Sequence, residues 1–270
     1  VLIYKSSGVF NFTQGEFGTV AVYALWNLHS SGMPYVLALL LALVAAVLLG
    51  LLVERLVVRP LFDAARVTLL VATAGVSLLL VGVEIWFGEA KLRQVAPAVR
   101  GTGVRILDTQ VTGQQLLLLA VLGALAALLA YFFNRTNLGL AILGASQEPT
   151  ATELVGISVR RLSGFTWGLA ALLGGLAGVI AVPVNSTFGP GALTASFLIP
   201  AFTAAVLGGF TSLPGAFVGG VLVGVVQSVA VTKVTSWFAF VPGSPGVLIV
   251  FLLLVGVLVV RPSGLLGGKA

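Results

Sequence analysis

Uncharged apolar runs of membrane-spanning length dominate the chain, and short charged or glycine- and proline-rich segments separate them. A spanning helix needs roughly 20 apolar residues. Runs that meet or approach this length predict crossings at 35–53, 67–87, 114–133, 162–182, 191–210, 215–232 and 244–260. We therefore expect an all-α fold, a polytopic transmembrane helical bundle with broken or re-entrant segments where turn residues interrupt a run.

Some segments leave the topology open. The segment 196–207 is short and contains Pro200, so it either belongs to a full span from near Gly191 or forms a re-entrant half-helix. Residues 17–28 are another short candidate. The pentapeptide Leu-Val-Val-Arg-Pro at 56–60 recurs at 258–262. If both copies end a helix on the cytoplasmic side, an even number of crossings must separate them. The count is even only if the segment with Pro200 crosses the membrane. Residues 1–4 read as the end of an apolar helix, so we expect a truncated first span.

Composition excludes several classes of protein. Of the 270 residues, 59% are hydrophobic and only 8% are charged, against about 25% in a soluble domain. Such a chain cannot cover a water-facing surface, which excludes a soluble enzyme, a DNA-binding domain and a disordered segment. Without cysteine, Cys-ligated metals and disulfides are excluded, and one histidine, His29, argues against a His-based metal site.

The net charge of +6 fits membrane topology better than nucleic-acid binding, because the basic residues lie thinly between apolar runs. Basic residues concentrate on the cytoplasmic side of membrane proteins. Applied to this chain, that rule predicts a polar external loop at 88–113 and a cytoplasmic loop at 134–161, within one transmembrane domain covering 1–270.

The cytoplasmic loop carries the most informative motif. Between Gly139 and Ser158, small residues alternate with Leu, Val and Ile, and Gly156 stands where a helix C-cap would be. A short helix with an apolar stripe at the membrane face suits docking into a groove of another protein. A simple amphipathic connector explains the same pattern, and both interpretations remain open.

A second motif, Asn-Phe-Thr-Gln-Gly-Glu at 11–16, puts a carboxylate and two amides beside an apolar segment. Polar groups at membrane depth are often functional. The alternative is an ordinary helix start, with Asn11 or Thr13 as N-cap and Glu16 in the first turn. We expect Glu16 near an inner helix end and Glu84 near an outer end, and neither at mid-membrane.

Two further motifs are rich in glycine. The segment 208–216, Gly-Gly-Phe-Thr-Ser-Leu-Pro-Gly-Ala, marks a break between apolar runs, either for close helix packing or for a bend at a translocation path. The tail at 261–268, Arg-Pro-Ser-Gly-Leu-Leu-Gly-Gly, lacks the spacing, preceding strand and final Ser/Thr of a phosphate-binding loop. The chain therefore shows no nucleotide site of its own.

Together and in this order, these motifs resemble the branched-chain amino acid ABC transporter permease family over nearly the whole chain. The matching positions are Asn11, Phe12, Gly15, Glu16, Glu54, Arg55, Arg59, Pro60, Leu61, Ala151, Gly156, Ile157, Gly208, Gly209, Ser212, Gly215, Ala216 and the tail 261–267. The arginine that this family usually carries near 143–145 is absent, and Pro149 interrupts the helix that follows.

The resemblance implies a non-enzymatic pathway subunit of an inner-membrane importer, with no catalytic residue, metal or cofactor of its own. It implies two ATP-binding subunits, a second permease chain (a paralogue or a copy), an external substrate-binding protein and surrounding lipid as partners, and no nucleic acid. For coupling to the ATP-binding subunits we select Gln147, Glu148, Glu153, Leu154, Gly156 and Ile157. For the substrate pathway, polarity alone selects Asn11, Gln14, Glu16, Thr73, Ser77 and Gln227.

Three alternatives are weighed against this interpretation. Related permeases for urea or short amides share the motifs, so the substrate stays open. An ion-coupled secondary transporter or channel would need intramembrane acids. An intramembrane serine protease would need a Ser with a His or Lys partner inside the bilayer, whereas His29 lies in a polar turn.

Overall fold

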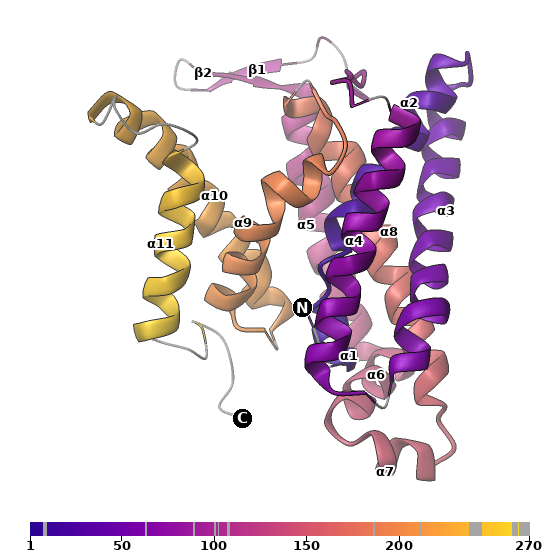
Figure 1. The fold of residues 1–270 in the computed structure, drawn as a ribbon. Coiled ribbons are helices and arrows are strands. Elements are labelled where there is room, and N and C mark those ends of the chain that lie inside the picture. Colours follow the sequence, from indigo (N-terminus) through magenta and orange to yellow (C-terminus); the bar gives the residue numbers. More distant parts are fainter. Residues whose placement is uncertain are drawn as a thin grey trace. The chain divides into compact units, whose positions relative to one another are not determined.

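The computed structural model describes residues 1–7, 10–62, 64–88, 90–99, 101, 103–106, 109–185, 187–210, 212–237, 245–260 and 264. Helices dominate these residues, as the apolar runs predict (Figure 1). In chain order the elements are α1 (Leu2–Ser7), α2 (Gln14–Ser30), α3 (Tyr35–Val53), a π-helix (Glu54–Val58), a 3₁₀ turn (Arg59–Leu61), α4 (Arg66–Gly88), β1 (Gly103–Ile106), β2 (Thr109–Thr112), α5 (Gly113–Arg135), α6 (Asn137–Gln147), α7 (Pro149–Leu154), α8 (Val159–Asn185), α9 (Ala192–Gly208), α10 (Leu213–Trp237) and α11 (Pro245–Val260).

The helices fall into two compact units. The larger unit comprises residues 6–194, and the smaller one comprises residues 1–5 and 195–270. Within the described residues, four helical segments are long and apolar enough to cross a membrane, and all four belong to the larger unit: Tyr35–Leu61, Arg66–Gly88, Gly113–Arg135 and Val159–Val184. The chain is therefore a multi-pass membrane protein.

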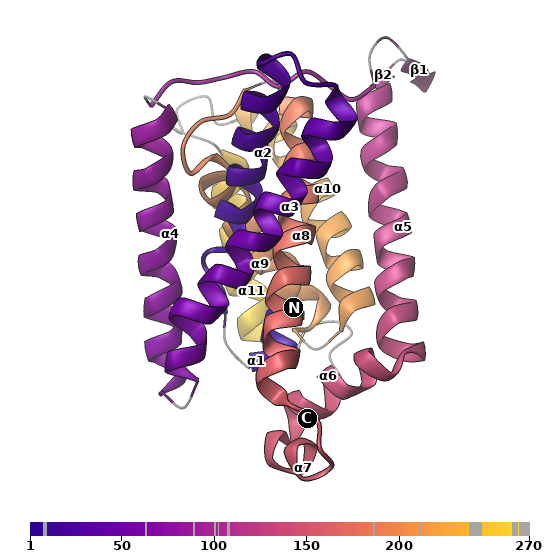
Figure 2. The same cartoon turned by 90° about the vertical axis from the view of Figure 1, so that its right-hand side faces the viewer.

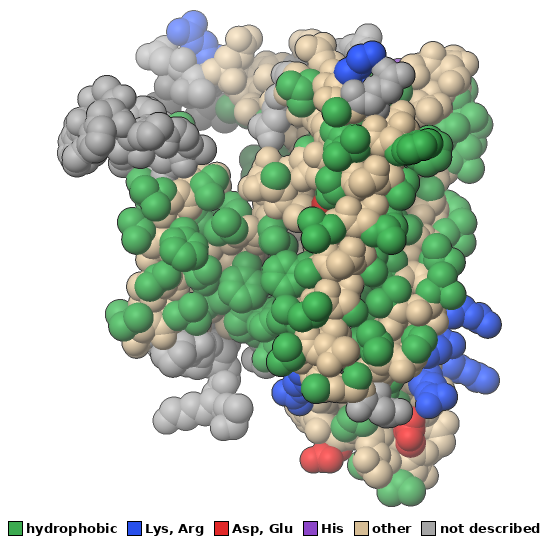
Figure 3. Space-filling view, in the orientation of Figure 1, with side chains coloured by type: hydrophobic (Ala, Val, Ile, Leu, Met, Phe, Trp, Pro, Cys, Tyr) green, Lys and Arg blue, Asp and Glu red, His purple; other side chains and the backbone are tan. Residues whose placement is uncertain are grey.

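The larger unit is built on the mutual packing of α2, α3 and α8, with α4 and α5 flanking this group (Figure 2). On α3, a buried stripe repeats every fourth residue as Ala38, Ala42, Ala46 and Gly50. Small side chains let helix backbones approach closely, which drives association in lipid. Most of the leucines on the remaining faces of α3 are exposed, as expected for a helix that faces lipid (Figure 3).

The backbones of α2 and α8 approach each other closely. A Cβ atom at Gly178 would stand 2.8 Å from the carbonyl oxygen of Gly18, and one at Gly18 would stand 2.9 Å from the carbonyl oxygen of Gly174. Glycine is needed at these positions because the neighbouring backbone leaves no room for a side chain, and not because of an unusual φ angle. The clustered glycines of 174–178 therefore serve close helix packing.

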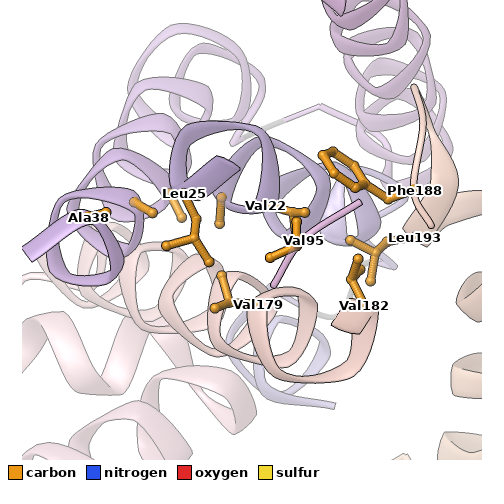
Figure 4. Packing of buried hydrophobic residues seen from close by; sticks show 11 residues of the cluster. Val22, Leu25, Ala38, Val95, Val179, Val182, Phe188 and Leu193 are labelled. Carbon is orange, nitrogen blue, oxygen red and sulfur yellow. The ribbon is translucent and has the colours of Figure 1, made fainter. Parts of the chain in front are cut away.

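A hydrophobic cluster closes one end of this helix group (Figure 4). Val22 and Leu25 of α2 meet Val179 of α8, and the loop after α4 adds Val95 to the same cluster. That loop continues into the antiparallel hairpin β1–β2, which the apolar pattern did not predict. The hairpin and α7 lie at opposite ends of the larger unit (Figures 1 and 2).

In the smaller unit, α9 and α10 meet across the glycine-rich break. Gly208 lies directly against Gly215, and Gly219 lies against the carbonyl of Ala204, so neither position has room for a side chain. The segment with Pro200 forms one continuous helix of 17 residues. From the tail motif only Gly264 lies within the described residues, and it packs against Gly209.

Candidate substrate pathway and coupling loop

The start of α2 forms a buried polar cluster with α4. The Thr13 hydroxyl donates to the carbonyl of Thr73 at 3.0 Å, and the Phe12 amide donates to the Thr73 hydroxyl at 3.4 Å. The Ser77 hydroxyl donates to Glu16 Oε1 at 3.4 Å. These three hydrogen bonds fix the first turn of α2 against two successive turns of α4.

The cluster lies at the middle of a span. Ser77 is the central residue of α4, which runs from Arg66 to Gly88, and Ser77 contacts Glu16. Glu16 does lie near a helix end, in the first turn of α2, and its contact with Ser77 places that end beside the middle of α4. α2 begins partway through the unit, so its first turn reaches the level of the α4 midpoint.

The motif does form the start of a helix, as the alternative interpretation predicts. Its side chains, however, bond to neighbouring helices and do not cap α2. Thr13 occupies the N-cap position of α2, yet its side chain makes no capping bond. Its hydroxyl donates to the Thr73 carbonyl instead, and its amide donates to Asn11 Oδ1 at 2.9 Å. Gln14 reaches α8, where its Nε2 donates to the carbonyl of Ala170 at 2.9 Å.

The structure thus brings together five of the six side chains selected for the pathway: Asn11, Gln14, Glu16, Thr73 and Ser77. They come from α2, its preceding turn and α4, and Gln14 adds α8. Gln227 lies on α10 in the smaller unit, where it packs beside Gly246 of α11.

A second group of candidates gathers near the C-terminal end of α4, where Glu84 was expected but its partner and Arg93 were not. Glu84 accepts a hydrogen bond from the amide of Gly191 at 2.8 Å. Arg93 places its guanidinium 4.0 Å from the ring centroid of Trp26 and donates to the carbonyl of Gly88 at 3.1 Å. Arg93 also pairs through its backbone with Phe188. No sequence signal joins residues so far apart in the chain.

The loop between α4 and α5 is fastened at both of its ends. Besides the Arg93–Phe188 bridge, Gln114 at the start of α5 accepts from the amide of Ala98 at 3.0 Å and donates to the carbonyl of Ile180 at 2.9 Å. A loop tied to α5 and α8 in this way covers one end of the larger unit.

The loop at the other end folds as two short helices. Pro149 begins α7 directly after α6 ends, so the proline divides the helix as its position predicts. Gly156 ends α7 with a φ of +84°. The Ile157 amide donates to the carbonyl of Thr152 and the Gly156 amide to that of Glu153, which together form a Schellman C-cap.

Part of this loop is buried against the larger unit, and the rest is accessible. Ile142 and Ala145 of α6 are buried, and the Thr136 hydroxyl caps α6 by accepting from the Gly139 amide at 3.1 Å. The six residues selected for coupling are exposed or half-buried. Leu154 is 84% exposed, an unusual position for a leucine outside a lipid-facing span.

The loop connects directly to the span that packs in the centre of the unit. α8 begins at Val159, immediately after the loop. One turn later, Gly164 faces the ion pair between Glu54 and Arg59, whose closest atoms lie 2.9 Å apart. Glu54 is 2% exposed, so this charge pair is held between the ends of α3 and α8.

Comparison with known proteins supplies the final observations. The family described as branched-chain amino acid transport system / permease component matches residues 1–258. The high-affinity branched-chain amino acid transport system permease protein BraD of Pseudomonas aeruginosa is 29% identical, with 98% of this chain and 88% of BraD covered. LivH of Escherichia coli K12, a permease of the same printed description, is 25% identical over the same shares. No solved structure matches the chain.

Proposed function

Because this chain belongs to the family of branched-chain amino acid transport permease components, we propose that it forms the translocation pathway of an ATP-driven importer for branched-chain amino acids in the inner membrane. The observation that supports this pathway most is the start of α2, where buried polar groups meet the midpoint of α4. Discontinuous helices that begin near the bilayer midplane commonly build substrate sites in transporters.

The chemistry of this cluster suits a zwitterion with an apolar side chain. The start of a helix carries partial positive charge that favours a carboxylate, while Glu16 supplies a negative charge for an ammonium group. Amide and hydroxyl groups of Gln14 and Ser77 supply neutral hydrogen-bonding partners. We assign Asn11, Gln14, Glu16, Thr73, Ser77 and Gln227 to the pathway.

We place the energy source outside this chain. The loop 134–161 would lie in the cytoplasm and present Gln147, Glu148, Glu153, Leu154, Gly156 and Ile157 to ATP-binding subunits, two per importer. Exposed apolar side chains on a short, capped helix suit a groove on such a subunit. The loop 88–113 would face outward, toward an external substrate-binding protein, and a second permease chain would complete the pathway.

Motion would enter the membrane through α8. A displacement of α7 acts on the start of α8, and α8 packs along α2 and α3. Through the Gln14–Ala170 bond, α8 also reaches the polar cluster. This gives a continuous mechanical connection from the cytoplasmic loop to the proposed substrate site.

The test combines co-purification with uptake. We expect the tagged full-length protein, extracted gently from native membranes, to retain ATP-binding subunits and a second permease. Leu154→Asp should release the ATP-binding subunits by placing a charge in the docking groove. Leu92→Asp, at a comparably exposed leucine (77%) in the external loop, is the matched control and should retain them.

Uptake into vesicles then distinguishes the substrates. ATP-dependent accumulation of leucine and valine supports the proposal, and accumulation of urea or short amides instead would reassign the substrate. A protein that purifies without ATP-binding partners and transports without ATP would refute the importer and leave an ion-coupled carrier or channel.

A further inference from the structure

Three buried polar atoms without a hydrogen-bond partner lie near the C-terminal end of α4. They are the hydroxyl oxygen of Tyr23 on α2, Oε1 of Glu84 on α4 and Nε of Arg93 in the loop that follows, and no described residue bonds to any of them. Buried polar groups in native proteins are nearly always hydrogen-bonded, so each exception requires an explanation. Three exceptions in one place require a common explanation.

Gly88, the last residue of α4, connects two of these groups. Arg93 Nη2 donates to the Gly88 carbonyl at 3.1 Å, and a Cβ atom at Gly88 would stand 2.8 Å from the Tyr23 hydroxyl oxygen. Phe188 completes a closed set of contacts, because its ring lies edge-on to Tyr23 with 4.9 Å between the centroids and its backbone pairs with that of Arg93. Tyr23 and Arg93 therefore lie close together, and each keeps an unused donor.

Glu84 adds an unused acceptor beside them. It stands one turn before Gly88 on the same face of α4, about 6 Å along the helix axis. The Gly191 amide donates to Glu84 Oε2 at 2.8 Å and fixes the carboxyl group, while Oε1 has no donor. Within the described part of the chain, no ion pair joins Glu84 to Arg93.

Arg93 is a cation without an anion among the described residues. Its guanidinium lies 4.0 Å from the ring centroid of Trp26 and donates to the Gly88 carbonyl, and neither group carries a negative charge. Guanidinium and phenol groups are both strong donors to a carboxylate. An anionic group placed against Arg93 Nε and the Tyr23 hydroxyl would satisfy both donors and neutralise the cation.

The surroundings of these polar atoms are apolar. Tyr23 and Trp26 pack against the hydrophobic cluster that includes Val95, Phe188 and Leu193 (Figure 4). Sites for small organic ligands combine such apolar walls with a few polar groups that fix orientation. These walls suit an aliphatic side chain better than a strongly hydrated inorganic ion.

We infer that Tyr23, Glu84 and Arg93 form a binding site for an aliphatic amino acid, in which Arg93 and the Tyr23 hydroxyl bind the carboxylate and Glu84 Oε1 accepts from the ammonium group. The identity of the ligand rests on the proposed transport function. Glu84 stands seven residues, or about two turns, from Ser77, so this site is separate from the mid-span cluster and forms a second station on the pathway. The three atoms are buried in this conformation, and a substrate reaches them when the pathway opens.

The direct test is leucine binding to the purified full-length chain in lipid nanodiscs, followed by tryptophan fluorescence. A carboxylate at Arg93 changes the electrostatic environment of the Trp26 ring, so we expect a saturable signal that is lost in Trp26→Phe. Leucinamide lacks the carboxylate and 4-methylpentanoate lacks the ammonium group, and each should bind about tenfold more weakly or worse. No saturable signal with leucine, or equal binding of both analogues, would overturn the inference.

Two variants separate the site from the fold. Tyr23→Phe removes only a hydroxyl that no described residue uses, so the chain should fold normally and bind leucine several-fold more weakly. Arg93→Lys keeps the charge, removes the Nε donor and should weaken binding as well. Tyr131→Phe, at an exposed tyrosine (64%) of α5, is the matched control and should bind as the wild type does.

Unchanged leucine affinity in Tyr23→Phe would overturn the site, because it would assign the unpaired atoms to trapped water. This variant decides the question even if Arg93→Lys fails to fold. Leucine binding without ATP-driven uptake by the assembled importer would refute the proposed function and leave the site intact. ATP-driven leucine uptake at the wild-type rate in Tyr23→Phe, without a Trp26 signal, would refute the site and leave the function intact.

Discussion

Replacing Gly178 with alanine tests whether contact between α2 and α8 holds the larger unit together. The new Cβ would stand 2.8 Å from the carbonyl oxygen of Gly18 and 3.0 Å from the carbonyl carbon and Cα of the same residue. All three are backbone atoms, so no side-chain rotation relieves the clash and the helices must separate. Overpacking of this kind costs about 1–3 kcal/mol.

A matched variant isolates this cost. Gly123 lies in α5, and a Cβ there would meet nothing within 4 Å. Both substitutions gain helix propensity, by about 1 kcal/mol for alanine over glycine. Because that gain is common to both, the difference in free energy of unfolding between Gly178→Ala and Gly123→Ala should equal the overpacking cost, about 1–3 kcal/mol.

The assay is unfolding of the purified chain by denaturing detergent, followed by circular dichroism. Gly123→Ala should unfold at the wild-type midpoint or slightly above it, and Gly178→Ala clearly below it. Equal midpoints for the two variants would refute the reasoning, since they would show that α2 and α8 do not approach as closely as their backbones indicate.

Substitutions at Arg59, Arg93 and Thr136 have expected outcomes that the same preparation can measure. Arg59→Gln should lower the free energy of unfolding by about 2 kcal/mol, because it leaves Glu54 buried without its cation, and adding Glu54→Gln should recover most of this loss. Arg93→Gln should cost about 1 kcal/mol through the lost contact with the Trp26 ring, and Arg93→Lys should cost less. Thr136→Ala should remove about 1 kcal/mol of capping and speed hydrogen exchange at the start of α6.

Much of the architecture follows from local sequence signals. Each apolar run corresponds to a helix, because length and hydropathy suffice to specify a span in lipid. The division of the loop 134–161 at Pro149 and the end of α7 at Gly156 were also predictable, since proline begins α7 and glycine supplies the positive φ of the cap. These features depend on a few neighbouring residues.

Features that depend on residues distant in the chain could not be predicted from the sequence. The depth of Glu16 is set by where α2 starts beside α4, and no local pattern encodes that alignment. Glu84 meets the Gly191 amide across more than a hundred residues. Polarity did select the side chains that gather near mid-span, because buried polar groups must find partners, but it could not say which partners they find.

The ion pair of Glu54 and Arg59 was only partly predictable from the sequence. Both residues belong to a recognisable motif, but a spacing of five does not place two side chains on one face of an α-helix. The π-helix at Glu54–Val58 makes the contact possible, since its wider turn brings residues five apart into line.

The helix α5 has a consequence for how the protein can change over evolutionary time. Its buried residues stand only at its two ends, Gly113 and Gln114 at one and Phe133 at the other. Between them the helix needs only to be apolar and helical, so Leu, Ala, Val and Phe can exchange freely there. Sequence drift among descendants should therefore concentrate in the middle of α5 and spare its ends, where Gln114 binds the Ile180 carbonyl.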